Sequence, residues 1–242
     1  MPPDPTSLPH LSARSVLLSM LLGSHPDRMS PAALVRAGEH FDIPASTVRV
    51  ALTRAVAAGD LRRADGDYAL GARLARRQQH QDEAVLDDEI PWDGSWEMAV
   101  VVVSGRSGPE RAALRDQLTA HRLAEVREGV WTRPANLSRA RGYADDVVLT
   151  TFSARPDGDP ANLAADLWDL TGWAKDGRTL LRMLSKATAP AARLAVAASL
   201  VRHLASDPLL PEALLPRNWP ADEMRKTYAA YQSELRVLAL PE

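Results

Sequence analysis

The sequence has 242 residues, with 29 basic and 31 acidic side chains and 45% hydrophobic residues, which is an ordinary composition for a globular protein with a sizeable core. It contains no cysteine, which excludes disulfide frameworks, thiolate zinc sites and cysteine nucleophiles. No apolar run approaches the roughly 18 residues of a membrane span, and the first residues lack the pattern of a secretory signal. We therefore expect a cytoplasmic protein without a membrane partner.

Charge is distributed unevenly along the chain. Residues 1–80 carry ten Arg and seven acidic residues, a net charge of +3, whereas residues 81–242 have a net charge of −5. The basic side chains are 26 Arg and three Lys, and Arg favours bidentate contacts with phosphate or guanine. Codon bias in an Ala- and Arg-rich genome is the alternative explanation for this excess of Arg over Lys. If the protein binds a polyanion, we expect the N-terminal region to do so.

Residues 1–10 are Pro-rich and are expected to form a disordered tail. Three amphipathic helices are expected next, at 11–22, 31–40 and 45–58. A four-residue turn separates the last two. The dipeptide Asp65-Gly66, between two short β-prone runs, is a strong signal for a two-residue hairpin. Helix, helix, tight turn, helix and hairpin are the layout of a winged helix-turn-helix, which we place at residues 11–80.

Residues 81–91 are polar and are expected to form a linker or a solvent-exposed helix. Strands are then predicted at 97–103, 123–126, 130–132 and 147–152, and helices at 109–121 and 136–143. This β-α-β-β-α-β order predicts a ferredoxin-like middle domain at 92–155. Four further helices, at 161–174, 178–187, 189–206 and 222–239, predict an α-helical C-terminal domain at 156–242. The expected fold class is therefore α+β and multidomain.

The third predicted helix carries the strongest functional signal. Its apolar residues recur at helical spacing and mark a buried face: Val48, Ala51, Leu52, Ala55 and Val56. The other side carries short hydrogen-bonding side chains, Arg and one Val: Ser46, Thr47, Arg49, Val50, Thr53 and Arg54. Ser and Thr hydrogen-bond phosphate or bases, Arg binds guanine bidentately, and Val contacts a thymine methyl. These residues predict a DNA recognition helix, with a plain solvated helix face as the alternative.

The predicted hairpin adds two cations. Arg62 and Arg63 lie in its first strand, within reach of a DNA phosphate backbone. Its tip, Asp65-Gly66-Asp67, is acidic, whereas a segment that enters the minor groove uses Arg or Lys. We therefore expect the tip to be a structural turn.

Several motifs recur in a fixed order along the chain. In the N-terminal region they are ARSVL at 13–17 and VRVALTR at 48–54. Further along they are PWDGSW at 91–96, GVWTRP at 129–134, LWDL at 167–170, DPLLP at 207–211, LLP at 214–216 and WP at 219–220. Together they resemble the PaaX family of bacterial repressors, named after the regulator of phenylacetic acid degradation. The resemblance covers nearly the whole chain.

The resemblance implies a transcription factor with a winged helix, a ferredoxin-like middle domain and a helical C-terminal domain. Such proteins act as homodimers that bind a double-stranded DNA operator and repress a catabolic operon until an acyl-CoA effector releases them. The chain departs from the family in two places. Pro44 stands at the start of the third helix, where the family often has Ser, which leaves Asp42 as a candidate cap. The wing tip is acidic rather than basic.

We expect a low-molecular-weight effector to bind near the middle domain. Three Trp and three Arg are the candidate contacts: Trp92, Trp96, Trp131, Arg133, Arg139 and Arg141. Indole rings stack on an aromatic acyl group, and guanidinium groups pair with coenzyme A phosphates. Core packing of the Trp and solvated positions for the Arg are the alternatives. The acyl-CoA itself is implied by the resemblance alone.

Signals of catalysis are absent from the sequence. It has no G-x-S-x-G, Walker or G-x-G-x-x-G motif, and its six His are scattered without the spacing of metal ligands. Small CRISPR-associated nucleases, which the middle domain resembles, carry a metal-binding carboxylate where this chain has Val103-Ser104-Gly105. We therefore expect neither an enzyme nor a cofactor or metal. The alternative to a DNA-binding regulator is a protein–protein adaptor that has lost DNA binding.

Overall fold

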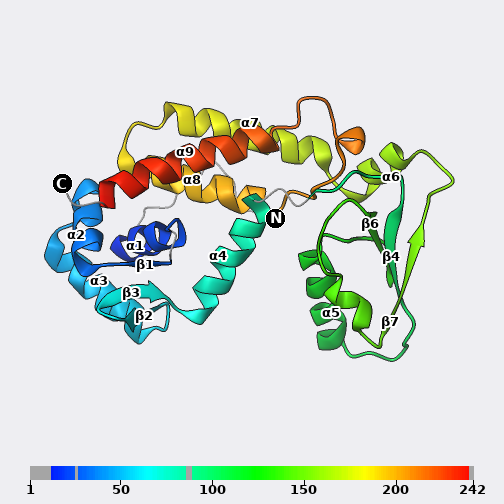
Figure 1. Ribbon diagram of the computed structural model, residues 1–242, viewed down its shortest axis with the longest axis horizontal. Helices are drawn as coiled ribbons and strands as arrows, with labels where there is room; N and C mark the ends of the chain where they lie inside the picture. Colours follow the sequence, from blue (N-terminus) through cyan, green and yellow to red (C-terminus); the bar gives the residue numbers. More distant parts are fainter. Residues whose placement is uncertain (1–11, 25–26, 86–88, 240–242) are drawn as a thin grey trace. The chain divides into compact units, whose positions relative to one another are not determined.

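The computed structural model describes residues 12–24, 27–85 and 89–239 (Figure 1). It contains both helices and strands, and its two sheets are antiparallel. The described residues form two compact units, each assembled from separate stretches of chain. The first unit contains the residues up to 85, 174–207 and 220–239, and the second contains 89–173 and 208–219. The predicted tail, residues 1–10, lies outside the described residues.

Three helices open the first unit, close to their predicted bounds: α1 (Ala13–Leu22), α2 (Pro31–His40) and α3 (Ala45–Ala57). The hydroxyls of Ser12 and Ser30 cap α1 and α2, because they accept the backbone N–H groups of Ser15 and Ala33. Apolar side chains that are almost fully buried form the core between these helices: Leu17, Leu21, Leu34, Val48 and Leu52.

The first unit also contains a three-stranded antiparallel sheet in the order β1-β3-β2. Its strands are β1 (Arg28–Met29), β2 (Leu61–Ala64) and β3 (Asp67–Leu70). Strands β2 and β3 form the predicted hairpin, and Asp65 and Gly66 have φ values of 53° and 89°, as a type I′ turn requires. The sequence did not predict β1, because two residues are too few to show a strand periodicity.

Four helices complete the first unit or continue into it: α4 (Ala72–Val85), α7 (Leu170–Lys186), α8 (Pro190–Leu204) and α9 (Ala221–Ala239). The region expected to be a linker or a helix from residue 81 is thus helical up to Val85, and residues 86–88 lie outside the described part. The buried amide of Gln78 donates to the carbonyls of Leu21, Leu22 and Ser24, which fixes α4 to the end of α1.

The break between the first two C-terminal helices lies earlier than predicted. Helix α6 (Pro160–Leu167) ends where Trp168 is extended, and the Asp169 carboxylate caps α7 by accepting the backbone N–H of Gly172. The break predicted between residues 174 and 178 is therefore wrong. Gly177 is buried inside α7, where an added Cβ would lie 2.8 Å from the sulfur of Met224. This glycine permits close helix packing rather than ending a helix.

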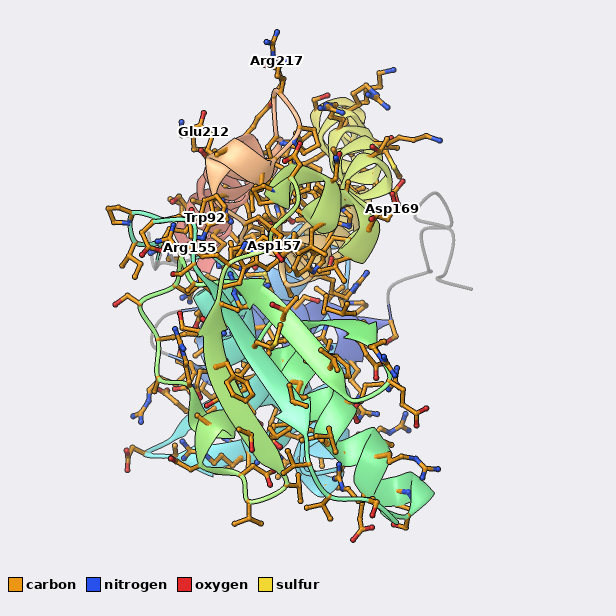
Figure 2. All side chains as sticks on the ribbon, turned by 90° about the vertical axis from the view of Figure 1, so that its right-hand side faces the viewer. Trp92, Arg155, Asp157, Asp169, Glu212 and Arg217 are labelled. Carbon is orange, nitrogen blue, oxygen red and sulfur yellow. The ribbon has the colours of Figure 1, made fainter. Side chains whose placement is uncertain are left out.

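The second unit contains a four-stranded antiparallel sheet in the order β5-β6-β4-β7. Its strands are β4 (Trp96–Val101), β5 (Ala124–Arg127), β6 (Val130–Pro134) and β7 (Leu149–Ala154). Helix α5 (Gly108–Ala120) follows β4 and packs Leu114 and Leu118 against Ala99 and Trp131 on one face of the sheet. The opposite face is turned toward the viewer in Figure 2, where no described helix crosses the middle of the strands.

The helix predicted at 136–143 is wrong. Only a short 3-10 helix, η1 (Gly142–Asp145), forms between β6 and β7. Side chains in this segment bond to distant parts of the unit: the Asn136 amide donates to the Leu209 carbonyl at 3.0 Å, and Arg139 pairs with Glu97. These bonds hold the segment out of a helix. A second short 3-10 helix, η2 (Glu212–Leu214), lies in the returning stretch of the unit.

Candidate nucleic-acid interface

Helix α3 buries one side and exposes the other, as its periodicity predicts. Val48 and Leu52 are fully buried, whereas Val50 is 50% exposed. The six predicted contact residues of this helix are all exposed: Ser46, Thr47, Arg49, Val50, Thr53 and Arg54. The Thr53 hydroxyl donates to the Arg49 carbonyl at 3.0 Å and keeps its oxygen as an acceptor. The structure therefore brings these six residues together on the exposed side of α3. Figure 1 shows this helix between α2 and the β2–β3 hairpin.

No side chain caps the N-terminus of α3. Its N-cap residue is Pro44, without a side-chain hydrogen bond. Asp42 is not the cap that the sequence allowed: it occupies the preceding turn with φ 56°, where its backbone N–H donates to the Glu39 carbonyl. The partial positive charge of the helix N-terminus and the Ser46 and Thr47 hydroxyls thus lie at one uncapped end. This arrangement suits an anion such as a phosphate group.

The arginines around α3 and the hairpin form two groups, those with an ion pair and those without one. Arg14 and Arg73 both pair with the buried carboxylate of Asp60, and Arg28 lies 3.5 Å from the carboxylate of Asp65. In contrast, three exposed arginines of α3 and the hairpin form neither an ion pair nor a ring contact within the described part of the chain: Arg49, Arg54 and Arg62. These three are available to a polyanion without the loss of an existing partner.

The hairpin cations differ in their surroundings. The guanidinium of Arg63 lies over the ring of Tyr68, 3.9 Å from its centroid, which is a cation–π contact. Arg62 is exposed and faces Ala69 across the strand pair. At the tip of the β2–β3 hairpin, the acidic Asp65 is paired with Arg28. Of the two hairpin cations, Arg63 is held by the Tyr68 ring, whereas Arg62 has no such contact.

Asp60 is a residue of this region that the sequence did not single out, because its partners are 13 and 46 residues away. It follows α3 directly, is 3% exposed, and accepts hydrogen bonds from Arg14 and Arg73. The hydrogen bond from Arg14 and the contribution of Arg73 hold the pKa of Asp60 below its usual value, although burial acts to raise it. The carboxylate therefore fixes α1 and the start of α4 to the end of α3.

We expect Asp60→Asn to lower the free energy of unfolding at pH 7 by about 1–3 kcal/mol, the loss of charge-assisted hydrogen bonds to partly exposed arginines. Because the folded-state pKa is lower than the unfolded value of about 3.9, this stabilisation is present above that value and is lost as the pH falls through the folded-state pKa. Urea denaturation at pH 7 and in steps below pH 4 measures it. The exposed Asp116→Asn is the control, and a difference that does not change with pH would contradict the assignment.

The candidate effector tryptophans are not on one surface. Trp96 and Ala99 lie on opposite sides of β4, and Trp131 pairs with Ala99, so Trp96 and Trp131 occupy opposite faces of the sheet. Trp92 and Trp96 belong to one apolar cluster and Trp131 to another. Figure 2 shows Trp92 at the end of the sheet where Arg155 also lies. An effector site that joins all three tryptophans stays a prediction.

The candidate effector arginines have partners inside the second unit. Arg133 is fully buried and donates to the carbonyl of Leu209 at 2.9 Å and to the amide oxygen of Asn136. Burial, followed by the nearby Arg139 guanidinium, lowers the pKa of Arg133 to about 9. Arg139 and Arg141 lie 3.2 Å and 3.6 Å from the buried carboxylate of Glu97. Phosphate binding by these three groups stays a prediction.

Among the described residues, no group of three His, Cys, Asp or Glu side chains is arranged to hold a metal ion. No described helix is both long and apolar enough to cross a membrane.

Comparisons with known proteins cover almost the whole chain. Three family models match: PaaX-like protein at residues 12–74, PaaX protein central Cas2-like domain at 89–162, and PaaX-like protein C-terminal domain at 168–241. The chain is also similar to a solved structure described as uncharacterized protein Rv0674 from Mycobacterium tuberculosis. The two are 42% identical with a TM-score of 0.82, over 95% of this chain and 98% of that one. No curated protein matches.

Proposed function

Because the chain belongs to the PaaX family, whose models match it from residue 12 to residue 241, we propose that it is a DNA-binding transcriptional regulator that reads its operator with α3. Membership of this family suggests a regulator of phenylacetic acid catabolism and not an enzyme. The finer assignment is a winged helix in which α3 enters the major groove and the β2–β3 hairpin lies beside the DNA backbone. The second unit is then the ferredoxin-like part.

One observation carries this proposal: the exposed face of α3 combines Ser and Thr hydroxyls, an apolar Val50 and the guanidinium groups of Arg49 and Arg54, which form no ion pair with a described residue. Base readout needs this mixture, since bidentate Arg contacts select guanine and an apolar contact selects the thymine methyl. The uncapped start of the helix adds an anion site at the end that approaches the phosphates. Arg62 extends the cationic surface onto the hairpin.

The proposed regulator is a homodimer that represses its operon until an acyl-CoA or related effector releases it. Two copies of α3 would read half-sites separated by about one helical turn or a multiple of it. The middle of the sheet face that no described helix crosses supports self-association, because Phe152 of β7 is 51% exposed and Val102, directly after β4, is 57% exposed. Sedimentation equilibrium of the full chain tests the dimer.

In-vitro selection from random duplex DNA, followed by binding of the selected sequence across a salt series, tests DNA reading directly. We expect enrichment of a two-fold symmetric site. Affinity should fall steeply with salt, because each phosphate contact releases counterions. No enrichment together with weak binding at every salt concentration would favour the adaptor alternative. Cleavage of the DNA on addition of magnesium would contradict the assignment as a non-enzyme.

We expect Arg49→Ala to weaken binding to the selected operator by about 1–3 kcal/mol and to relax the base preference at one position of each half-site. The matched control is Arg217→Ala, because Arg217 is exposed in the second unit and projects away from it in Figure 2. Electrophoretic mobility shifts with single-base operator variants measure both effects. An unchanged affinity and base preference would remove Arg49 from the readout residues.

A further inference from the structure

The second unit contains a cavity of about 700 Å³ that the proposed DNA interface does not use. Three stretches of this unit line it: the end of β4 with the loop that follows, the first turns of α5, and the turn between β5 and β6. The backbone N–H of Val101 donates to the Gly129 carbonyl at 2.8 Å, which holds the β5–β6 turn against the end of β4. A Cβ added at Gly105 or Gly108 would meet no atom within 4 Å, so the loop at the mouth of the cavity leaves it open to solvent.

Four arginines from all three stretches line this cavity: Arg106, Arg111, Arg115 and Arg127. Arg115 is already neutralised, because it lies 2.9 Å from the carboxylate of Glu125. The other three form no ion pair with a described carboxylate. Glu128 is the second acidic residue of the described lining, which therefore carries four positive and two negative side chains. An excess of guanidinium groups in a hollow favours the binding of an anion.

The backbone holds two of these cations in position. The Arg106 guanidinium donates to the Glu110 carbonyl, and the Arg111 guanidinium donates to the Arg106 carbonyl, both at 2.7 Å. A guanidinium group has five N–H donors, so each of the two keeps several for a ligand. Because their orientation is already fixed, less side-chain entropy is lost when an anion binds.

The carboxylate of Glu110 is close to Arg106 but does not line the cavity. It accepts the backbone N–H and the hydroxyl of Ser107, both at 2.7 Å, in the capping box at the start of α5. These two hydrogen bonds, followed by the smaller contribution of the Arg106 charge, hold the pKa of Glu110 below its usual value. The helix N-terminus is thus already occupied, and arginine side chains make the cavity cationic. With Glu110 counted as well, four cations still face three carboxylates.

Apolar side chains form the rest of the lining: Val101, Val103, Leu114 and Trp131. Val103 is 44% exposed, so a ligand can contact it directly. Trp131 is buried, and the Arg115 guanidinium lies over its ring at 5.7 Å from the centroid. Exposed guanidinium planes beside an apolar surface suit a planar ring that carries phosphates, because guanidinium groups both stack on a base and pair with phosphate oxygens.

We propose that this cavity binds the phosphate chain of a nucleoside di- or triphosphate, with the phosphates at Arg106, Arg111 and Arg127 and the nucleoside against Val103. Its volume of about 700 Å³ lies within the usual range of roughly 300–1,000 Å³ for sites of organic ligands. Three guanidinium groups without an acidic partner match a chain of several charges better than a single carboxylate. A hollow between short stretches of chain also suits a compact anion better than a DNA duplex. A free inorganic phosphate chain offers the same chemistry, and the site does not depend on the proposed reading of DNA.

Calorimetric titration of the full chain without DNA or magnesium tests the site, with tripolyphosphate, GTP, ATP and sulfate as probes. We expect R106Q/R111Q to weaken the binding of tripolyphosphate at least about tenfold, since charge-assisted hydrogen bonds hold the chain. E128Q is expected to tighten it about twofold, because a like charge leaves the lining. Partial unfolding could not produce such a gain. R155Q/R217Q, which removes two exposed arginines of the same unit outside this lining, is the matched control and is expected to bind as the wild type does.

The nucleotides distinguish the two sources of the chain. Tighter binding of GTP or ATP than of tripolyphosphate, with an advantage that V103N removes, assigns the site to a nucleotide. Equal binding assigns it to a free phosphate chain. A112E is expected to weaken every polyphosphate probe at least about tenfold, because it brings a carboxylate into the cavity and leaves all four arginines in place.

Three results would overturn the site. The first is that neither tripolyphosphate nor a nucleotide binds. The second is that sulfate binds as tightly as tripolyphosphate, which would show exposed cations without a site for a chain. The third is that R106Q/R111Q and A112E bind as the wild type does, whereas R49Q/R54Q loses binding, which would place the anion on α3. Because none of these titrations contains DNA, a failure of operator selection would refute the proposed function and leave the result for this cavity unchanged.

Discussion

Replacement of Glu97 by Ala is expected to lower the free energy of unfolding of the second unit by about 3–5 kcal/mol, the usual cost of removing one member of a buried charge cluster. Glu97 is 2% exposed and accepts hydrogen bonds from the Tyr143 hydroxyl and from Arg139 at 3.2 Å. Burial, with the hydrogen bond to Glu97, raises the pKa of Tyr143 above its usual value, so the phenol stays protonated and donates. Without the carboxylate, the buried Tyr143 hydroxyl loses its acceptor, and the largely buried Arg139 keeps its hydrogen bond to the His121 carbonyl but loses its ion pair.

Urea denaturation followed by tryptophan fluorescence measures this change, because all six tryptophans lie in the second unit: Trp92, Trp96, Trp131, Trp168, Trp173 and Trp219. Glu128→Ala, in the exposed turn between β5 and β6, is the control for loss of an acidic side chain. Tyr143→Phe combined with Glu97→Ala should cost less than the sum of the two single changes, since both remove the same bond. A loss below about 1 kcal/mol for Glu97→Ala would contradict the role of the cluster.

Gly71→Ala is expected to destabilise the first unit by about 3 kcal/mol, at the upper end of the usual cost of overpacking. An added Cβ would lie 2.1 Å from the carbonyl oxygen of Gly59 and 2.9 Å from that of Asp60, distances at which the backbone has to move. The Gly71 N–H also donates to the Asp60 carbonyl at 2.7 Å. The substitution therefore separates the end of α3 from the start of α4.

Far-UV circular dichroism is the appropriate signal for this variant, because no tryptophan lies in the first unit. Gly108→Ala is the matched control, since a Cβ there meets no atom within 4 Å and the position is at the start of α5. We expect the control to change stability by less than about 0.5 kcal/mol. Equal stability of Gly71→Ala and Gly108→Ala would show that the close approach at Gly71 has no energetic consequence.

Local signals predicted the N-terminal elements well. The Ser30-Pro31 pair fixed the start of α2, and Asp65-Gly66 fixed the hairpin, because each acts within three or four residues. The two failures lie where distant contacts decide the structure. Residues 136–143 have helical composition, but Asn136 bonds to Leu209, 73 residues away. A break was predicted between residues 174 and 178, yet Gly177 lies inside α7, where it allows the close contact with Met224.

The candidate site was predictable to a similar extent. Periodicity alone separated the buried and exposed sides of α3, since a regular helix places its own residues. It did not reveal which arginines were already paired, because Arg14 meets Asp60 across 46 residues and Arg73 meets it across 13. Sequence patterns also could not predict the cavity in the first unit that α1, α4, α8 and α9 line, because these helices come from separate stretches of the chain.

The interleaved course of the chain through its two units has a consequence for synthesis. Helix α2 packs against α9, but 190 residues separate their starts at Pro31 and Ala221. At 5–20 residues per second, a ribosome takes roughly ten to forty seconds to make that stretch. During this interval the apolar sides of α1 and α4 that α8 and α9 will cover are in water or on a chaperone. The nascent N-terminal region therefore cannot complete its packing before translation has passed the whole of the second unit.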